Sequence, residues 1–367
     1  MSKQNLTRRG FLKGVTAGST GVALLSLPPE AATTESSPVA SENYPLAQSD
    51  QTETLHILTL QNLLPENLEK MRRFSPRVEY ERVGSIEELN RRAADADAIF
   101  GRFTPDTLRA ATKLKWIQYA SAGVERILYP ELVNSSIVLT NMARMYAPGI
   151  AETAMGMLLA LARRIDDYVR QTDQHKWGNL DAVEIGGKTM GLVGFGGIGS
   201  TIAHHAHYGF GMRILAVDAK PLPKPPMADE LHEPEWLMDM VPQCDVLVSA
   251  APHTPITEKM FNEKVFRAMK QSAFFLNMSR GKLVDTPALV RALNEGWIAG
   301  AGVDVTHQEP LPAENPLWSA NHVIITSHSS GSSPKRRGRA EGLFLENVRR
   351  YVNGLPLLNV VDKKRGY

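Results

Sequence analysis

Residues 191–200 read GLVGFGGIGS, and they are the most informative part of the sequence about its fold. A strand-like apolar run leads into a turn that contains Gly194, Gly196 and Gly199, and a helix-like segment follows. In such a turn the first glycine makes the tight bend, the second lets the backbone approach a pyrophosphate, and the third lets helix and strand pack closely. The helix N-terminus then offers unpaired N–H groups to the phosphates. The pattern predicts a Rossmann domain that binds a dinucleotide.

Asp218 supports this prediction because it ends the next strand-like run, ILAVD. A carboxylate there can accept hydrogen bonds from both ribose hydroxyls of NAD, and it would repel the 2′-phosphate of NADP. Lys220 lies close enough in sequence to weaken the repulsion. We therefore expect NAD as the cofactor, with NADP as the alternative.

Strand-like and helix-like runs alternate on both sides of the turn. The strand-like runs begin with LHILTL at residues 55–60 and end with VIITS at residues 323–327, and a last helix-like run follows at residues 334–354. Strands separated by short helices imply parallel, doubly wound α/β sheets, and the chain is long enough for two such domains. Apolar side chains from Ile150 to Tyr168 repeat with helical spacing, which predicts one long helix at the domain boundary.

The N-terminal segment has a different character. Residues 7–13 read TRRGFLK, and a weakly apolar run from Val15 to Leu27 follows. This run is too short for a stable membrane span, which needs roughly 20 residues. The segment resembles a twin-arginine signal peptide, which we assign to residues 1–29. Residues 30–53 are poor in large apolar side chains and predict a disordered linker.

This leader implies a partner and a location. The twin-arginine export machinery would carry the protein to the periplasm already folded, and the protein would stay cytoplasmic if the leader does not act. The formal net charge of +2 comes from the basic leader, so the rest of the chain gives no reason to expect a nucleic-acid partner.

Metal chemistry finds little support in the sequence. Cys244 is the only cysteine, and it lies in an apolar run where a buried position is expected. His204, His205 and His207 follow the glycine-rich turn on a helix-like segment, where a solvated face is the simpler interpretation. We expect no metal site.

Three polar side chains stand at predicted element ends in the C-terminal part of the chain: Arg280, Glu309 and His328. Reduction of a 2-oxo acid needs a fixed cation for the carboxylate, a proton donor beside the carbonyl oxygen, and a hydride. Arginine suits the first role because its planar guanidinium stays charged and binds a carboxylate at two points. Histidine suits the second because it titrates near the working pH, and a neighbouring glutamate would orient it and stabilise its protonated form.

The motifs around these residues carry a resemblance. NMSRGKLVD (residues 277–285), GVDVTHQEP (302–310) and TSHSSG (326–331), together with the glycine-rich turn, resemble the D-isomer-specific 2-hydroxyacid dehydrogenases. The resemblance covers nearly the whole chain from about residue 54. It implies an NAD(P)-dependent enzyme that acts on the CH–OH group of a small 2-hydroxy acid, or reduces the corresponding 2-oxo acid.

The resemblance also implies residue roles. Arg280 would bind the substrate carboxylate, His328 would be the acid/base, and Glu309 its partner. In the turn SAGVE, backbone N–H groups around Ala122 and Gly123 would meet the carboxylate. The implied cofactor contacts are Gly194, Gly196, Gly197, Ile198, Gly199, Asp218, Ala251, Pro252, Met278, Ser279, Arg280, Asp304, His328 and Gly331.

For the architecture, the resemblance implies a Rossmann NAD-binding domain inserted into a flavodoxin-like substrate domain. The inserted domain would comprise residues 150–328, and the discontinuous substrate domain residues 54–149 and 329–367. Homodimers are usual in the family, so we expect a homodimer.

Two positions depart from the family pattern. Ser327 stands where proline is usual, and Ser330 where alanine is commoner. Both could alter the loop and the nicotinamide pocket without touching a catalytic role. Two alternative functions stay open: a dinucleotide-sensing binding protein without turnover, and a related dehydrogenase that acts on another small anion such as formate or phosphite. The presence of all three polar side chains argues against the first.

Overall fold

The structure is a computed structural model that describes residues 54–367. The signal peptide and linker predicted for residues 1–53 lie outside the described residues.

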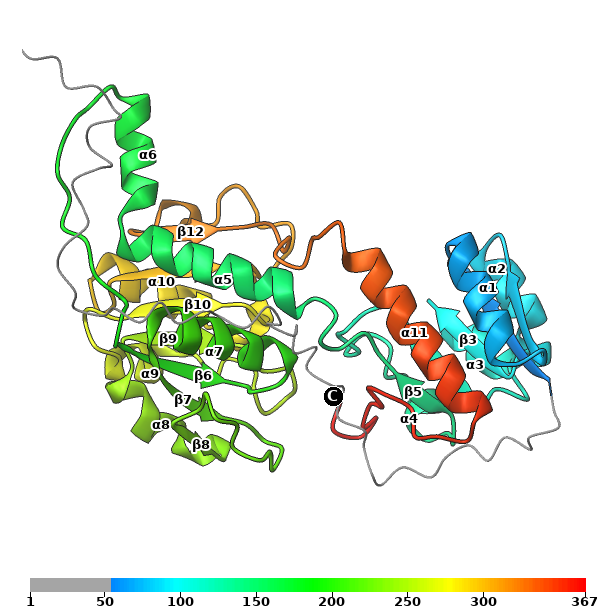
Figure 1. Ribbon diagram of the computed structural model, residues 1–367. Coiled ribbons are helices and arrows are strands. Elements are labelled where there is room, and N and C mark those ends of the chain that lie inside the picture. Colours follow the sequence, from blue (N-terminus) through cyan, green and yellow to red (C-terminus); the bar gives the residue numbers. More distant parts are fainter. Residues whose placement is uncertain (1–53) are drawn as a thin grey trace, which may run out of the picture. The chain divides into compact units, whose positions relative to one another are not determined.

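The N-terminal part forms a five-stranded parallel sheet with the strand order β2-β1-β3-β4-β5, the flavodoxin-like order (Figure 1). Its strands are β1 (Leu55–Thr59), β2 (Val78–Arg82), β3 (Ala98–Gly101), β4 (Trp116–Tyr119) and β5 (Val138–Thr140). The helices that alternate with them are α1 (Pro65–Phe74), α2 (Ile86–Arg92), α3 (Pro105–Ala110) and α4 (Pro130–Val133).

A helix from the C-terminal end also packs on this sheet. In α11 (Arg336–Val352), Phe344 stacks on Phe100 of β3 with ring centroids 4.0 Å apart. Tyr351 stacks on Trp116 of β4 at 5.6 Å. These buried aromatic contacts bring the end of the chain back to the sheet formed by its beginning.

The middle of the chain forms a seven-stranded parallel sheet with the strand order β12-β11-β10-β9-β6-β7-β8. Its strands are β6 (Thr189–Val193), β7 (Arg213–Val217), β8 (Glu230–His232), β9 (Val246–Ser249), β10 (Phe274–Asn277), β11 (Gly300–Val303) and β12 (Val323–Ile325). The accompanying helices include α7 (Gly197–Phe210), α8 (Leu237–Met240), α9 (Glu263–Ala268) and α10 (Thr286–Asn294). Strands β9, β10 and β11 are buried throughout, as expected of a parallel sheet covered on both faces. The two doubly wound parallel sheets predicted from the sequence are confirmed.

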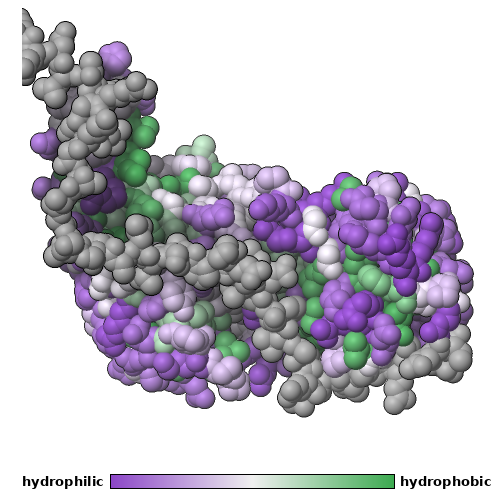
Figure 2. Space-filling view, in the orientation of Figure 1, coloured by the Kyte–Doolittle hydropathy of each residue, from purple (hydrophilic) through white to green (hydrophobic). Residues whose placement is uncertain are grey.

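The single long helix predicted before this sheet is wrong. The chain forms α5 (Ala147–Ala162) and α6 (Ile165–Asp173), because Arg164 between them has a left-handed φ of +57. α5 packs on α7 and on the strands β10 and β11. α6 buries none of its residues, so its apolar side chains face outward, as the green residues along it show in Figure 2.

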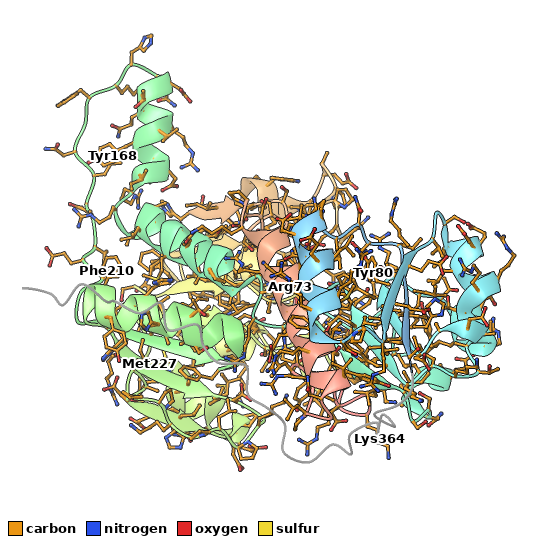
Figure 3. All side chains as sticks on the ribbon, turned by 45° about the vertical axis from the view of Figure 1, so that its right-hand side comes forward. Arg73, Tyr80, Tyr168, Phe210, Met227 and Lys364 are labelled. Carbon is orange, nitrogen blue, oxygen red and sulfur yellow. The ribbon has the colours of Figure 1, made fainter. Side chains whose placement is uncertain are left out.

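The segment after α6 runs back beside it. The backbone N–H of Leu180 donates a hydrogen bond to the Tyr168 hydroxyl at 3.1 Å, and Figure 3 shows Tyr168 between the helix and the returning segment. Ile165 and Val169 stay exposed on the same helix, and Trp177 is fully exposed in the segment that follows it. The helical spacing seen in the sequence is therefore present in α6, but this helix packs mainly against α5.

Candidate active site

The glycine-rich turn joins β6 to α7, and its glycines have different surroundings. Gly194 has a φ of +93, and a Cβ on it would lie 2.7 Å from the backbone nitrogen of Ala251. A Cβ on Gly199 would lie 2.1 Å from the carbonyl oxygen of Gly194, so helix and strand approach too closely for a side chain. At Gly196 the same position has no described atom within 4 Å apart from its own chain neighbours. The turn thus combines a tight bend, close packing and an open face, which fits a pyrophosphate group.

Asp218 follows β7 and faces this turn. Its Oδ2 accepts a hydrogen bond from the Phe195 N–H at 2.6 Å, and its Oδ1 accepts one from the Lys220 N–H at 2.8 Å. Carboxylate oxygens have further lone pairs, so both can still accept hydrogen bonds from ribose hydroxyls. The residues present therefore fit an adenine dinucleotide.

The other predicted cofactor contacts stand at the same edge of the second sheet, because the carboxyl ends of parallel strands meet at one edge. Ala251 and Pro252 follow β9, Met278 to Arg280 follow β10, Asp304 follows β11, and His328 and Gly331 follow β12; Gly197 and Ile198 begin α7. The turn after β6 marks the point where the strand order reverses, since β7 lies on one side of β6 and β9 on the other. Ligands of open α/β sheets bind at such a point.

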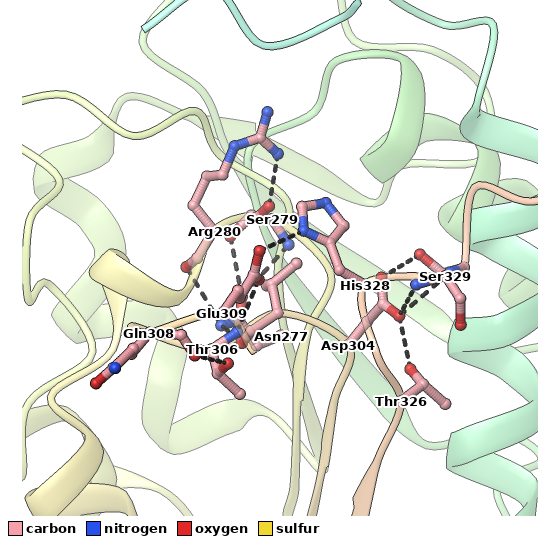
Figure 4. A network of polar contacts seen from close by, with 12 residues as sticks. Asn277, Ser279, Arg280, Asp304, Thr306, Gln308, Glu309, Thr326, His328 and Ser329 are labelled. Atoms are coloured by element: carbon pink, nitrogen blue, oxygen red, sulfur yellow. Dashed lines mark hydrogen bonds and ion pairs between the residues drawn. The ribbon is translucent and has the colours of Figure 1, made fainter. Parts of the chain in front are cut away.

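His328 and Glu309 lie within hydrogen-bond distance of each other in this edge region. The Nδ1 atom of His328 lies 2.8 Å from Oε2 of Glu309, as Figure 4 shows. The other Glu309 oxygen accepts a hydrogen bond from the Thr306 N–H at 3.2 Å, which orients the carboxylate. Nε2 of His328 has no hydrogen-bond partner among residues 54–367, and 48% of the side chain is exposed. Nε2 is therefore the imidazole atom that can exchange a proton with a bound molecule.

Buried Asp304 holds the loop that carries His328. Its Oδ1 accepts hydrogen bonds from the Thr326 hydroxyl at 2.6 Å and from the Ser329 N–H at 3.1 Å (Figure 4). The His328 N–H donates to the carbonyl oxygen of Asp304 at 2.8 Å, and His328 itself has a left-handed φ of +52. The Ser330 hydroxyl donates to the second Asp304 oxygen, so this departure from the family pattern adds a contact that alanine could not make.

Arg280 reaches from the end of β10 to the turn SAGVE. Its Nε donates to Oε1 of Glu125 at 2.9 Å, and its Nη1 donates to the Ser279 carbonyl oxygen at 2.8 Å. A Cβ on Gly123 would lie 1.9 Å from Nη2 of Arg280, so the guanidinium lies directly against the backbone of this turn. The carbonyl oxygen of Ala122 accepts from the Asn141 side chain at 2.7 Å, which fixes the turn.

Glu125 is the residue of this site that the sequence interpretation missed. Burial alone would raise the pKa of its carboxyl, but the charge and hydrogen bond of Arg280 outweigh burial, and the pKa is lowered. Glu125 is therefore ionised at neutral pH and directs one edge of the guanidinium, which leaves Nη2 for a ligand. Glu125 is the last residue of the SAGVE turn, so its place in that motif was the available signal.

Cys244 is buried two residues before β9, and burial raises the pKa of its thiol to about 12. Within residues 54–367, no three or more His, Cys, Asp or Glu side chains are grouped so that they could hold a metal ion. In the same range, no helix combines the length and apolar character needed to cross a membrane.

Comparison with known proteins identifies relatives of this chain. The family model for the NAD-binding domain of D-isomer specific 2-hydroxyacid dehydrogenases matches residues 155–330. A glyoxylate reductase from Thermococcus onnurineus is 36% identical over 309 residues, which cover 79% of this chain and 91% of that protein. A glyoxylate reductase from Korarchaeum cryptofilum is 33% identical over 289 residues, covering 74% and 85% respectively.

A solved structure is also similar to this chain. The NADPH-dependent glyoxylate/hydroxypyruvate reductase from Sinorhizobium meliloti, in complex with NADP and sulfate, superposes with a TM-score of 0.72. It is 25% identical, and the match covers 86% of this chain and 100% of that one.

Proposed function

The chain belongs to the D-isomer-specific 2-hydroxyacid dehydrogenase family, and from this premise we propose that it transfers a hydride between NAD(H) and small D-2-hydroxy or 2-oxo acids. The names of its relatives make glyoxylate the first candidate substrate. The observation that carries the proposal is the 2.8 Å pair between His328 and Glu309, at the sheet edge where the glycine-rich turn lies.

His328 is the acid/base in this proposal. Glu309 accepts the hydrogen bond of Nδ1–H, which fixes the tautomer and leaves Nε2 free. In reduction, the imidazolium donates its Nε2 proton to the carbonyl oxygen, and Glu309 stabilises the charged ring before the transfer. In oxidation, neutral Nε2 takes the hydroxyl proton. A nicotinamide cofactor, held at the turn by Gly194 to Gly199 and by Asp218, would supply or accept the hydride.

Arg280 binds the substrate carboxylate. Its Nη2 lies against Gly123, so a carboxylate that meets the guanidinium also meets the backbone of the SAGVE turn around Ala122. Two-point binding of the carboxylate would fix the orientation of the carbonyl group relative to His328.

NAD is favoured over NADP. Both oxygens of Asp218 already accept backbone N–H groups, which holds the negative charge where a 2′-phosphate would have to lie. The Sinorhizobium meliloti reductase uses NADPH, so the family accommodates both cofactors. A comparison of NADH with NADPH in the same assay decides the preference.

The test follows oxidation of NADH by the purified protein against a panel of small 2-oxo acids that includes glyoxylate. His328→Ala should lower kcat by roughly 10²- to 10⁴-fold, the usual contribution of a positioned acid/base. His307→Ala, which removes an exposed imidazole from the neighbouring loop, should leave kcat unchanged and is the matched control.

The outcomes separate the alternatives. Turnover that persists in His328→Ala would refute the assigned role of His328. NADH binding without turnover of any 2-oxo acid would favour the sensing protein, and turnover of formate or phosphite instead would favour the related dehydrogenase.

We further propose that the protein is a homodimer with the discontinuous domain division given above. The support for a dimer is α6, which exposes the apolar side chains of Ile165 and Val169 and buries none of its residues within one protomer. The support for the division is α11, which packs on the first sheet although it follows the second in sequence.

We also propose export by the twin-arginine machinery to the periplasm. This route carries folded proteins, so the protein would fold around its dinucleotide in the cytoplasm and leave with it bound. Replacing Arg8 and Arg9 by Lys should abolish export and leave activity unchanged. Parent protein found only in the cytoplasmic fraction, unprocessed and active, would refute this proposal.

A further inference from the structure

Arg144 has an unusual backbone conformation for its residue type. It lies between β5 and α5 and has a φ of +70, in the left-handed region that residues with a Cβ rarely adopt. Hydrogen bonds hold the segment on both sides. Asn141 Oδ1 accepts from the Ala143 N–H at 3.0 Å, and the Arg144 carbonyl oxygen accepts from the Ala147 N–H at 3.0 Å. Strained residues of this kind concentrate at ligand sites.

The side chain of Arg144 starts directly beside the glycine-rich turn. A Cβ on Gly197 would lie 2.5 Å from Cγ of Arg144 and 2.9 Å from its Cα. Arg144 can therefore lie this close to the turn only because residue 197 has no side chain. Gly197 is the first residue of α7, whose N-terminal N–H groups have no side-chain cap. The guanidinium is only a few bonds beyond Cγ, which puts this helix end within its reach.

No side chain among residues 54–367 neutralises Arg144. It forms no ion pair with a carboxylate in that range, and it is half-buried. Burial lowers the pKa of Arg144, and no acidic neighbour counteracts this effect. By contrast, Arg164, which also has a left-handed φ, lies 2.6 Å from Asp167. A half-buried guanidinium without a carboxylate is costly unless an anion reaches it.

We propose that Arg144 binds the pyrophosphate of the dinucleotide at the N-terminus of α7. This rests on the proposed function only in taking the glycine-rich turn as the dinucleotide site. The planar guanidinium offers several N–H donors to phosphate oxygens, and its charge adds to the partial positive charge of the helix end. Helix α7 begins with Gly197, which carries no charged side chain. The positive charge at this helix end therefore comes from Arg144, in the segment between β5 and α5, rather than from the turn itself.

The experiment measures dinucleotide binding and stability separately. Arg144→Gly removes the charge and suits a φ of +70, so the thermal midpoint of the ligand-free protein should stay equal or rise. The Kd for NADH, measured by nicotinamide fluorescence, should rise about 10- to 100-fold, as expected for the loss of one charge-assisted hydrogen bond. Arg144→Asn, which also tolerates the left-handed region, should behave alike.

A matched control and a second ligand locate the contact. Arg163→Gln removes an exposed positive charge at the far end of α5 and should leave the Kd for NADH unchanged. ADP-ribose has the pyrophosphate but no nicotinamide, so its Kd should rise in Arg144→Gly by the same factor as that of NADH. Unchanged affinity for both ligands, or weaker NADH binding alone, would overturn the role of Arg144 and leave the cofactor site standing. A parent protein that binds neither ligand would overturn both.

Discussion

Gly123 shows how a residue without a side chain can set the geometry of a site. A Cβ there would lie 1.9 Å from Arg280 Nη2 and 2.7 Å from Glu125 Oε2, both at the ends of flexible side chains. Gly123→Ala should therefore fold but displace the guanidinium. We expect the KM for the 2-oxo acid to rise about tenfold or more, as for the loss of one good contact, and the Kd for NADH to stay unchanged.

The control for this change is Gly209→Ala in α7, where a Cβ would meet nothing within 4 Å. It should leave KM unchanged and slightly stabilise the helix. Steady-state kinetics and NADH titration of both variants are the measurements. An unchanged KM in Gly123→Ala would contradict the assignment of SAGVE as the substrate loop.

For single residues, the sequence predicts which kinds of side chain form the site better than it predicts which of them contact each other. Arg280, Glu309 and His328 stand in recognisable motifs, and the structure brings His328 and Glu309 into contact. The ion pair of Arg280 with Glu125 joins residues 155 positions apart, and no local pattern reveals such a pair. The positive φ of Arg144 was equally inaccessible, because arginine gives no signal for a left-handed conformation.

Among the helices, α11 is hydrogen-bonded to the start of α1 through one buried carboxylate. Glu341 of α11 accepts hydrogen bonds from the Leu64 N–H at 3.0 Å and the Asn67 side chain at 2.6 Å, at the start of α1. Arg337 Nε donates to its other oxygen at 2.6 Å. Leu64 has no side-chain acceptor of its own to cap α1, so Glu341 supplies the cap from the other end of the chain.

This arrangement predicts how stability changes with pH. Burial alone would raise the pKa of Glu341, but the hydrogen bonds from Asn67, Arg337 and Leu64 outweigh it, and the pKa is lowered from 4.5. Between the lowered folded-state pKa and about pH 4.5, Glu341 binds more protons in the unfolded chain than in the folded one. Its stabilisation of the fold is therefore complete above about pH 4.5 and is lost as the pH falls through the folded-state pKa.

Glu341→Gln should lower the free energy of unfolding by about 1–3 kcal/mol near neutral pH, since it weakens a buried charged hydrogen-bond network. Urea unfolding at neutral pH and at about pH 3 measures this difference, which should shrink at the lower pH. Glu346→Gln, on the same helix, removes partly exposed pairs with Arg349 and Arg350 and should cost less than about 1 kcal/mol. A Glu341→Gln difference that is independent of pH would contradict the assignment.

Elements were predicted best where an apolar run is buried. Every strand with such a run was predicted, whereas the short polar edge strand β8 was not, because its residues are half-exposed or exposed. The break between α5 and α6 was missed for a related reason. The apolar stripe continues through Arg164, and only the left-handed backbone there ends the first helix.

For the whole molecule, the alternation of runs predicts two parallel sheets, but it does not say which sheet a late helix joins. The expectation that the chain end returns to its first part came from the family resemblance alone. The contacts of Phe344 with Phe100 and of Tyr351 with Trp116 supply its physical basis, since each buries an aromatic ring that would otherwise face water.

The exposed apolar side chains of α6 predict where two copies of the chain meet. Ile165 and Val169 lie one turn apart on α6 and are exposed, as is Trp177 nearby, which is the surface expected of a helix covered by a second copy of the chain. Val169→Glu would place a charge in that contact, and we expect it to weaken dimerisation at least 100-fold, which corresponds to about 3 kcal/mol. Sedimentation velocity over a range of protein concentrations measures the effect. Ile256→Glu, at another exposed apolar side chain in the segment between β9 and α9, is the matched control and should leave the dimer intact. A parent protein that stays monomeric at high concentration, or a Val169→Glu variant that dimerises like the parent, would show that α6 is not the dimer contact.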